Sequence, residues 1–236
     1  MRGSAVRPRR DQVAELTRGV RLPLAPVADE HLQILAEGLR QAFDDIRVHA
    51  PDAVAKGEEP EVTALMQARL NRLIDEGSLW GQLVLWVGRG MESISFDGSH
   101  LEKRPDLSIV LSGVERRFPM VVEAKILDSA SSKTTARYCE NGIRRFVEGE
   151  YAWANCEAFM IGYVRDSSSI DAALNEFLST SMVMNPHRFR VEALPVPVGT
   201  FSSDLAYTRH GRNFVYSSQP PPNSPGSISI WHLWLD

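Results

Sequence analysis

Cysteine is scarce in this sequence, and long apolar runs are missing. The 236 residues include two cysteines, Cys139 and Cys156, far from any histidine pattern that would suggest a zinc site. Two thiols make no disulfide framework, so we expect no disulfide and a reducing, cytoplasmic compartment. No run approaches the roughly 18 apolar residues of a membrane span, and the basic N-terminus lacks the apolar core of a secretory signal. We therefore expect a soluble protein with no membrane partner.

Glycine-rich nucleotide-binding motifs are also missing. The 16 glycines form neither a Walker-type loop nor a dinucleotide-binding fingerprint. If the protein requires ATP, we expect a separate ATPase or sensor subunit to supply it. The serine-rich segment 129–133 has no base nearby in sequence, so nucleophilic serine catalysis has no support.

Acidic residues slightly outnumber basic ones, and most of the basic residues are arginines. The formal net charge of −4 argues against a protein that coats nucleic acid by bulk electrostatics, although local basic clusters can still attract phosphate. Each basic cluster could instead be part of a solvated surface, and His210 could instead lie in a solvated loop. The candidate nucleic-acid contacts are Arg137, Arg144, Arg145, Arg209, His210 and Arg212.

Lysine is rarer still. Only four of the 26 basic residues are lysines, and three of these lie in polar surroundings. The fourth, Lys125, lies in the apolar stretch FPMVVEAKIL (118–127) together with Glu123. Burying either charge without a partner is costly. A lysine at this position indicates a compact ammonium whose pKa can be tuned, rather than a fork of donors.

Hydrophobic spacing predicts the order of the elements. The expected order of helices, a hairpin, a helix, a strand and a helix predicts an α/β fold with a mixed sheet. We expect residues 1–50 to form an arm and a helix, and 51–236 to form the main domain with a C-terminal strand extension, all as one globular unit. The expected helices are 29–47, 61–76, 134–153 and 170–183, with an arm or short helix at 11–24. The expected strands are 93–98, 106–111, 119–125, 158–164 and short strands after 187, with an ambiguous apolar segment at 79–90, a break at 51–60 and a surface loop at 217–227.

The charged pair in the apolar strand has a geometric explanation. Glu123 and Lys125 are two residues apart and project to one face, while Val122 and Ala124 face the opposite layer. In a hairpin, Asp106 at the start of the first strand lies near the end of the second. Two carboxylates from neighbouring strands suit Mg²⁺, which keeps several waters and takes other ligands from substrate phosphate. The ammonium can orient water and stabilise charge on the phosphate, so the pattern predicts phosphodiester hydrolysis.

These residues resemble a known signature. Arg104-Pro105-Asp106-Leu107, followed at hairpin distance by Glu123-Ala124-Lys125, resembles the motif of the PD-(D/E)XK, or restriction-endonuclease-like, nuclease superfamily. The resemblance spans roughly residues 58–165. It implies a restriction-endonuclease-like core with a four-stranded mixed sheet flanked by helices. It also implies a Mg²⁺ cofactor, for which Mn²⁺ substitutes.

The resemblance also implies roles for single residues. Asp106 and Glu123 look like metal ligands and Lys125 like the catalytic lysine. A glutamate from the preceding helix often completes such sites. Glu61 is the best match because it opens the 61–76 helix, and Glu58 is its competitor. The basic 134–153 helix would offer Arg144 or Arg145 to phosphate. It departs from the Gln-x-x-x-Tyr form of some branches, so Tyr138 and Asn141 receive no role.

Three functions remain open at this stage. The first is a Mg²⁺-dependent endonuclease acting on DNA, a deoxyribonuclease that serves as effector of a restriction or anti-phage defence system. The second is a repair or recombination nuclease of the same fold, and the third is an inactive nuclease-like subunit that binds nucleic acid or a partner. Double-strand cutting favours a homodimer, since one site cuts one strand at a time. The structural alternative for the site is a buried Glu–Lys pair satisfied by its neighbours, and His232 is expected to be a hydrogen-bonded core histidine.

Overall fold

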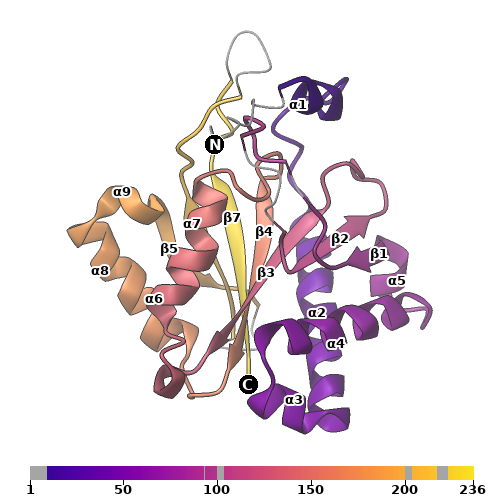
Figure 1. The fold of residues 1–236 in the computed structure, drawn as a ribbon, viewed down its shortest axis with the longest axis vertical. Helices are drawn as coiled ribbons and strands as arrows, with labels where there is room; N and C mark the ends of the chain where they lie inside the picture. The colour runs from indigo at the N-terminus through magenta and orange to yellow at the C-terminus, as the bar shows by residue number, and fades with distance from the viewer. Residues whose placement is uncertain (1–9, 93, 100–103, 200–203, 217–222) are drawn as a thin grey trace, which may run out of the picture.

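The computed structural model describes residues 10–92, 94–99, 104–199, 204–216 and 223–236 (Figure 1). The helices are α1 (Arg10–Leu16), α2 (Asp29–His49), α3 (Pro51–Lys56), α4 (Glu59–Ile74), α5 (Leu79–Leu83), α6 (Thr135–Tyr138), α7 (Arg144–Val147), α8 (Glu176–Met184) and α9 (Pro186–Phe189). A 3-10 turn covers Ser129–Ser131, and π-helical turns cover Cys139–Ile143 and Ile170–Asn175. The strands are β1 (Val84–Gly88), β2 (Leu107–Leu111), β3 (Met120–Leu127), β4 (Glu157–Val164), β5 (Val191–Pro197), β6 (Leu205–His210) and β7 (Ile228–Leu235).

A single mixed sheet forms the centre of the fold. Its strand order is β1-β2-β3-β4-β7-β6-β5. Strands β3, β4 and β7 run parallel, and every other neighbouring pair is antiparallel. The α/β class with a mixed sheet flanked by helices is confirmed. The expectation of four strands is wrong, because the described residues form a sheet of seven.

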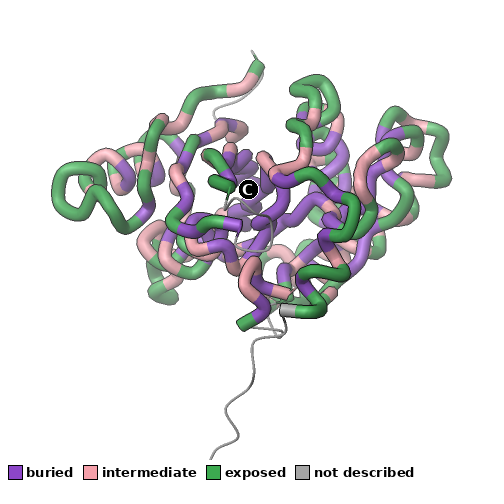
Figure 2. Tube along the Cα trace, turned by 90° about the horizontal axis from the view of Figure 1, so that it is seen from above, coloured by how far each residue is buried: buried purple, intermediate pink, exposed green. Residues whose placement is uncertain are grey.

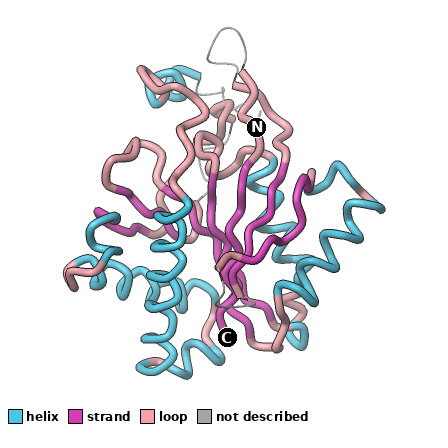
Figure 3. Tube along the Cα trace, turned by 180° about the vertical axis from the view of Figure 1, so that it is seen from behind, coloured by secondary structure: helices cyan, strands magenta, loops and turns pink. Residues whose placement is uncertain are grey.

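Helices cover the two faces of this sheet (Figures 1 and 3). Helices α2, α4 and α5 share one apolar core with the β3 residues Val122, Ala124 and Ile126. The segment from α6 to α7 and helix α8 share a second core with Val121 and Leu127. The buried residues therefore gather in the middle of the molecule and the exposed ones on the outer helices (Figure 2). Alternate residues of β3 face different layers, as the period of a strand requires.

The segment that carries the basic residues lies close against β4. A Cβ built on Gly142 would lie 2.1 Å from Met160 Cε on β4. Glycine at this position lets the helix backbone approach the sheet, and the π-helical turn lies at the same point. The close approach keeps this segment against β4, the strand next to β3.

Most expected elements are present with shifted ends. The helices at 29–47, 61–76 and 170–183, the hairpin and the strand at 158–164 are confirmed. The break at 51–60 contains helix α3, and the ambiguous segment contains α5 and β1. The 134–153 helix ends at Val147. Residues 94–98 form no strand, while Ser93 and residues 217–222 lie outside the described residues.

Helix α2 belongs to the main core. Its buried face packs with α4 and the sheet, so this helix of the expected 1–50 segment is part of the same globular unit. Among the helices of the described chain, none combines the length and apolar composition that crossing a lipid bilayer requires.

Candidate active site

The site forms where strand β2 begins beside β3. Pro105 precedes β2 and has no N–H with which to extend the ladder. Beyond the part of β3 that pairs with β2, two of its amides bond to carboxylates: Ala124 N donates to Asp106 Oδ2 at 2.8 Å, and Ile126 N donates to Glu59 Oε2 at 3.3 Å. The need to satisfy buried backbone groups thus draws both carboxylates to β3.

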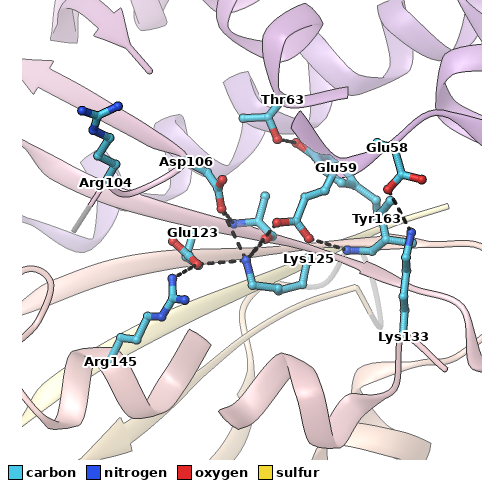
Figure 4. A network of polar contacts seen from close by, with 12 residues as sticks. Glu58, Glu59, Thr63, Arg104, Asp106, Glu123, Lys125, Lys133, Arg145 and Tyr163 are labelled. Carbon is cyan, nitrogen blue, oxygen red and sulfur yellow. Dashed lines mark hydrogen bonds and ion pairs between the residues drawn. The ribbon is translucent and has the colours of Figure 1, made fainter. Parts of the chain in front are cut away.

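Lys125 lies at the centre of these acids (Figure 4). Its Nζ is 2.9 Å from Glu123 Oε1, 3.0 Å from Glu59 Oε1 and 3.5 Å from Asp106 Oδ2. Burial lowers the pKa of Lys125, but the three carboxylates outweigh burial and raise the pKa above its ordinary value. Lys125 is therefore a charged ammonium at neutral pH. The charges that the apolar strand carries are compensated by each other and by residues from α4 and from the start of β2.

Glu123 is the most buried of the acids, with an exposed fraction of 1%. Its Oε1 accepts from Lys125 and, at 2.8 Å, from Arg145 Nη1. Its Oε2 is buried and has no hydrogen-bond partner within the described chain. Burial and the neighbouring Asp106 carboxylate raise the pKa of Glu123 to about 7, while Lys125 and Arg145 oppose this shift. An oxygen buried without a partner is unusual and points to a ligand.

Two carboxylates, those of Asp106 and Glu123, are the side chains that could bind a metal ion here. No cluster of three or more histidine, cysteine, aspartate or glutamate side chains in the described residues is arranged to hold an ion. Asp106 and Glu123 lie around one point, and Glu123 Oε2 is uncommitted. Mg²⁺ commonly binds through one or two carboxylates plus waters and substrate oxygens, so the donor set fits Mg²⁺ rather than an ion held in an all-protein cage.

A cleft of about 510 Å³ opens beside the acids. Lys125 and Glu59 lie on its wall, and the opposite wall comes from the α6–α7 segment. Arg137 is exposed there, and Lys133 Nζ lies 3.5 Å from Glu58 at the rim. The cleft therefore joins Lys125 and Glu59 to the basic α6–α7 segment.

The helical glutamate is not the one expected. Helix α4 begins at Glu59, and this residue contacts Lys125. Glu61 is exposed, because residues two apart on a helix point to nearly opposite sides. The competitor Glu58 reaches Lys133 rather than Lys125. Both oxygens of Glu59 are engaged, by Lys125 and by Ile126 N, so Glu59 holds Lys125 in place.

The expected nucleic-acid contacts separate into two groups. Arg137, Arg144 and Arg145 lie on the segment beside the cleft, with Arg144 exposed and bonded to Glu148 at 2.6 Å. Arg209 is exposed on β6, three strands away from β3, and pairs with Glu192 at 3.2 Å.

Two expected contacts are corrected because their side chains are buried. His210 is completely buried in strand β6, neither in a loop nor near the acids, and bonds to Thr208 and to the carbonyl of Phe189. Arg212 is 7% exposed and donates to the carbonyls of residues 152, 153, 155 and 227. The expectation for His232 is confirmed, since it is buried and hydrogen-bonded.

Sequence reasoning missed Glu59 and Tyr151. A signal for Glu59 exists: Pro60 favours the first turn of a helix, which moves the helix start back to Glu59. Tyr151 Oη lies 3.0 Å from Arg145 Nη1, but nothing in the sequence around it marks this role.

Comparison with known protein families, with curated proteins and with solved structures finds no match to this chain.

Proposed function

We propose that the protein is a Mg²⁺-dependent endonuclease that hydrolyses phosphodiester bonds in DNA. The observation that carries this proposal is the convergence of Asp106 and Glu123 on Lys125, where β2 begins beside β3. Lys125 also lies on the wall of a cleft that basic residues line. Glu123 Oε2 is buried without a hydrogen-bond partner in the described residues, which leaves it available to bind an ion.

We assign a different role in the reaction to each residue of the site. Asp106 and Glu123 would hold the ion, which when bound lowers the pKa of water and draws charge from the phosphate oxygens. In the hydrolysis, the water oxygen would form the new bond to phosphorus and release one proton to solvent, while the bond to the 3′ oxygen breaks and that oxygen takes one proton from solvent. Lys125 carries a fixed positive charge that stabilises the added negative charge on the phosphate. Glu59 keeps the ammonium at this position.

Basic residues beside the cleft suit a polyanionic substrate. Arg137 lies on the cleft wall in an exposed position, and its charge attracts the phosphate backbone despite the net charge of −4. An endonuclease with this single site would cut both strands as a homodimer, in keeping with a role in defence against foreign DNA.

A cleavage assay tests the proposal. Purified protein is incubated with supercoiled plasmid, linear duplex, single-stranded DNA and RNA, each with Mg²⁺, Mn²⁺ or EDTA. We expect metal-dependent cutting of DNA that falls by about 100-fold or more in Lys125→Ala and Glu123→Ala. Circular dichroism of both variants shows that the fold is retained. Cutting that persists in EDTA or in both folded variants would contradict the proposal.

A further inference from the structure

Arg145 is directed at an acid rather than into solvent. Its Nη1 lies 2.8 Å from Glu123 Oε1, and its side chain is 31% exposed while that of Glu123 is 2% exposed. Figure 4 shows the guanidinium pointing from α7 to Glu123. This contact differs from the phosphate contact that the sequence suggests for this arginine.

Tyr151 fixes the guanidinium from a second direction. Arg145 Nη1 also lies 3.0 Å from Tyr151 Oη, and the guanidinium carbon lies 5.4 Å from the centre of the Tyr151 ring. The phenol donates its own proton to the carbonyl of Arg104 at 3.0 Å, so its oxygen accepts from Arg145. Arg104 directly precedes the Pro105-Asp106 pair. The chain of contacts thus joins α7, Glu123 and the start of β2.

The contact to Glu123 leaves one carboxylate oxygen uncommitted. Arg145 and Lys125 both bond to Oε1, and Oε2 is buried without a partner in the described part of the chain. A planar guanidinium held on both an aromatic ring and a hydroxyl has little rotational freedom. The orientation of the Glu123 carboxylate is therefore set by a rigid neighbour.

From this geometry we infer that Arg145, clamped by Tyr151, is a positioning residue that orients Glu123 for metal binding. The inference rests on the proposed function, because it assigns Glu123 as a metal ligand. Partners that orient a metal ligand typically contribute 10- to 100-fold to metal affinity or activity. A phosphate contact would act on substrate binding instead.

The experiment compares Arg145→Lys and Tyr151→Phe with the wild type, using the full chain. Calorimetric titration with Mn²⁺ gives the metal Kd, and plasmid cleavage gives kcat and KM. We expect Arg145→Lys to raise the metal Kd by about 10- to 100-fold and to lower kcat, with KM for DNA unchanged. Tyr151→Phe shifts the metal Kd in the same direction by less, because it removes only the hydroxyl.

Arg69→Met is the matched control. Arg69 is a partly buried arginine on α4 that pairs with Asp45 and Glu76 and does not line the cleft. Its loss lowers the unfolding temperature but leaves the metal Kd unchanged, which separates destabilisation from positioning.

Two outcomes overturn the inference in distinguishable ways. If the wild type binds Mn²⁺ and cuts DNA, while both variants keep its metal Kd and raise KM, Arg145 binds phosphate and positions nothing. If the wild type neither binds Mn²⁺ nor cuts DNA, the proposed function fails and the assignment of Glu123 as a ligand fails with it.

Discussion

A buried lysine without a partner would destabilise the fold, but Lys125 is paired with carboxylates on several sides. Its ammonium lies within 3.5 Å of three carboxylates, and they hold its pKa above the ordinary value. A permanently charged lysine is a poor general base. The chemistry we assign to it is therefore the stabilisation of charge on phosphate.

Glu59, at the start of α4, holds Lys125 in place, so we expect its loss to slow cleavage. Glu59→Gln weakens the hold on Lys125 and slows DNA cleavage by on the order of 100-fold, because small displacements of a catalytic group are costly. Glu61→Gln changes an exposed carboxylate on the other side of the helix and retains the wild-type rate. Single-turnover cleavage of the two variants checks this, and an equal loss in both would refute the assignment of Glu59.

Sequence alone reaches part of this site. Asp106, Glu123 and Lys125 follow from local rules, since the strand period places two of them together and the hairpin brings the third. Glu59 is missed because a helix start is uncertain by a residue or two, and a shift of two residues turns a side chain to the other face. The orientation of Arg145 depends on Tyr151, whose position only the folded chain fixes.

At the scale of elements, a buried hydrogen-bond chain joins two strands to the flanking helices. Its links are Tyr138 Oη to His232 Nδ1 at 2.8 Å, His232 Nε2 to Thr208 Oγ1 at 2.7 Å, Thr208 Oγ1 to His210 Nε2 at 2.7 Å, and His210 Nδ1 to the carbonyl of Phe189 at 2.7 Å. The carbonyl only accepts, so His210 Nδ1 carries a proton and its Nε2 accepts from Thr208. Thr208 then accepts from His232, which accepts from Tyr138. Every donor in the chain thus points the same way.

Thr208 is the central link of this chain, and its removal gives a second prediction. Thr208→Val leaves one ring nitrogen of each histidine without a partner in a fully buried site. We expect a loss of about 2 kcal/mol or more in the free energy of unfolding, measured by urea denaturation. Thr208→Ser keeps the hydroxyl and should lose much less. A Val variant as stable as the Ser variant would show that the chain contributes no net stability.

The same chain explains one error at the scale of elements. The polar segment TRHGR resembles a loop in sequence, yet Thr208 and His210 face inward on β6, where pairing with β7 buries them. Helices α2 and α4, in contrast, carry long apolar stripes and were predictable from their spacing. Local periodicity therefore identified the long helices, while tertiary pairing decided which polar residues are buried.

At the scale of the whole molecule, Glu157 makes stability depend on pH. It begins β4 and accepts from Val27 N at 3.2 Å. Burial raises its pKa from 4.5 to about 7. The folded state therefore binds the proton more tightly, so stability from this group is full below about pH 4.5 and is lost as the pH rises to about 7.

Glu157→Gln tests this dependence. The amide oxygen can still accept from Val27 N, and the cost of burying a charge is removed. We expect the variant to be more stable than the wild type by about 1–2 kcal/mol at pH 8, and to show little difference at pH 4.5. The free energy of unfolding of the wild type is subtracted from that of the variant at each pH. The buried histidines contribute equally in both proteins, so their contribution cancels. A constant difference across this range would contradict the assignment.

The order of the sheet was only partly predictable. The β2–β3 hairpin is a local connection between adjacent segments and was expected from the sequence. The position of β7 between β4 and β6 joins segments far apart in the chain, and no local pattern specifies this pairing. The family resemblance implies a four-stranded sheet, whereas the described residues form a sheet of seven strands.

We propose that Asp106, Glu123 and Lys125 form a metal-dependent hydrolytic site. The most direct measurement is the nicking rate of supercoiled plasmid in Mg²⁺ by the wild type and by Asp106→Asn, with EDTA as the metal-free condition. We expect the wild type to nick the plasmid in Mg²⁺ but not in EDTA, and we expect the nicking rate of the folded variant to be lower by about 100-fold or more. Nicking that is unchanged by Asp106→Asn or by EDTA would contradict it.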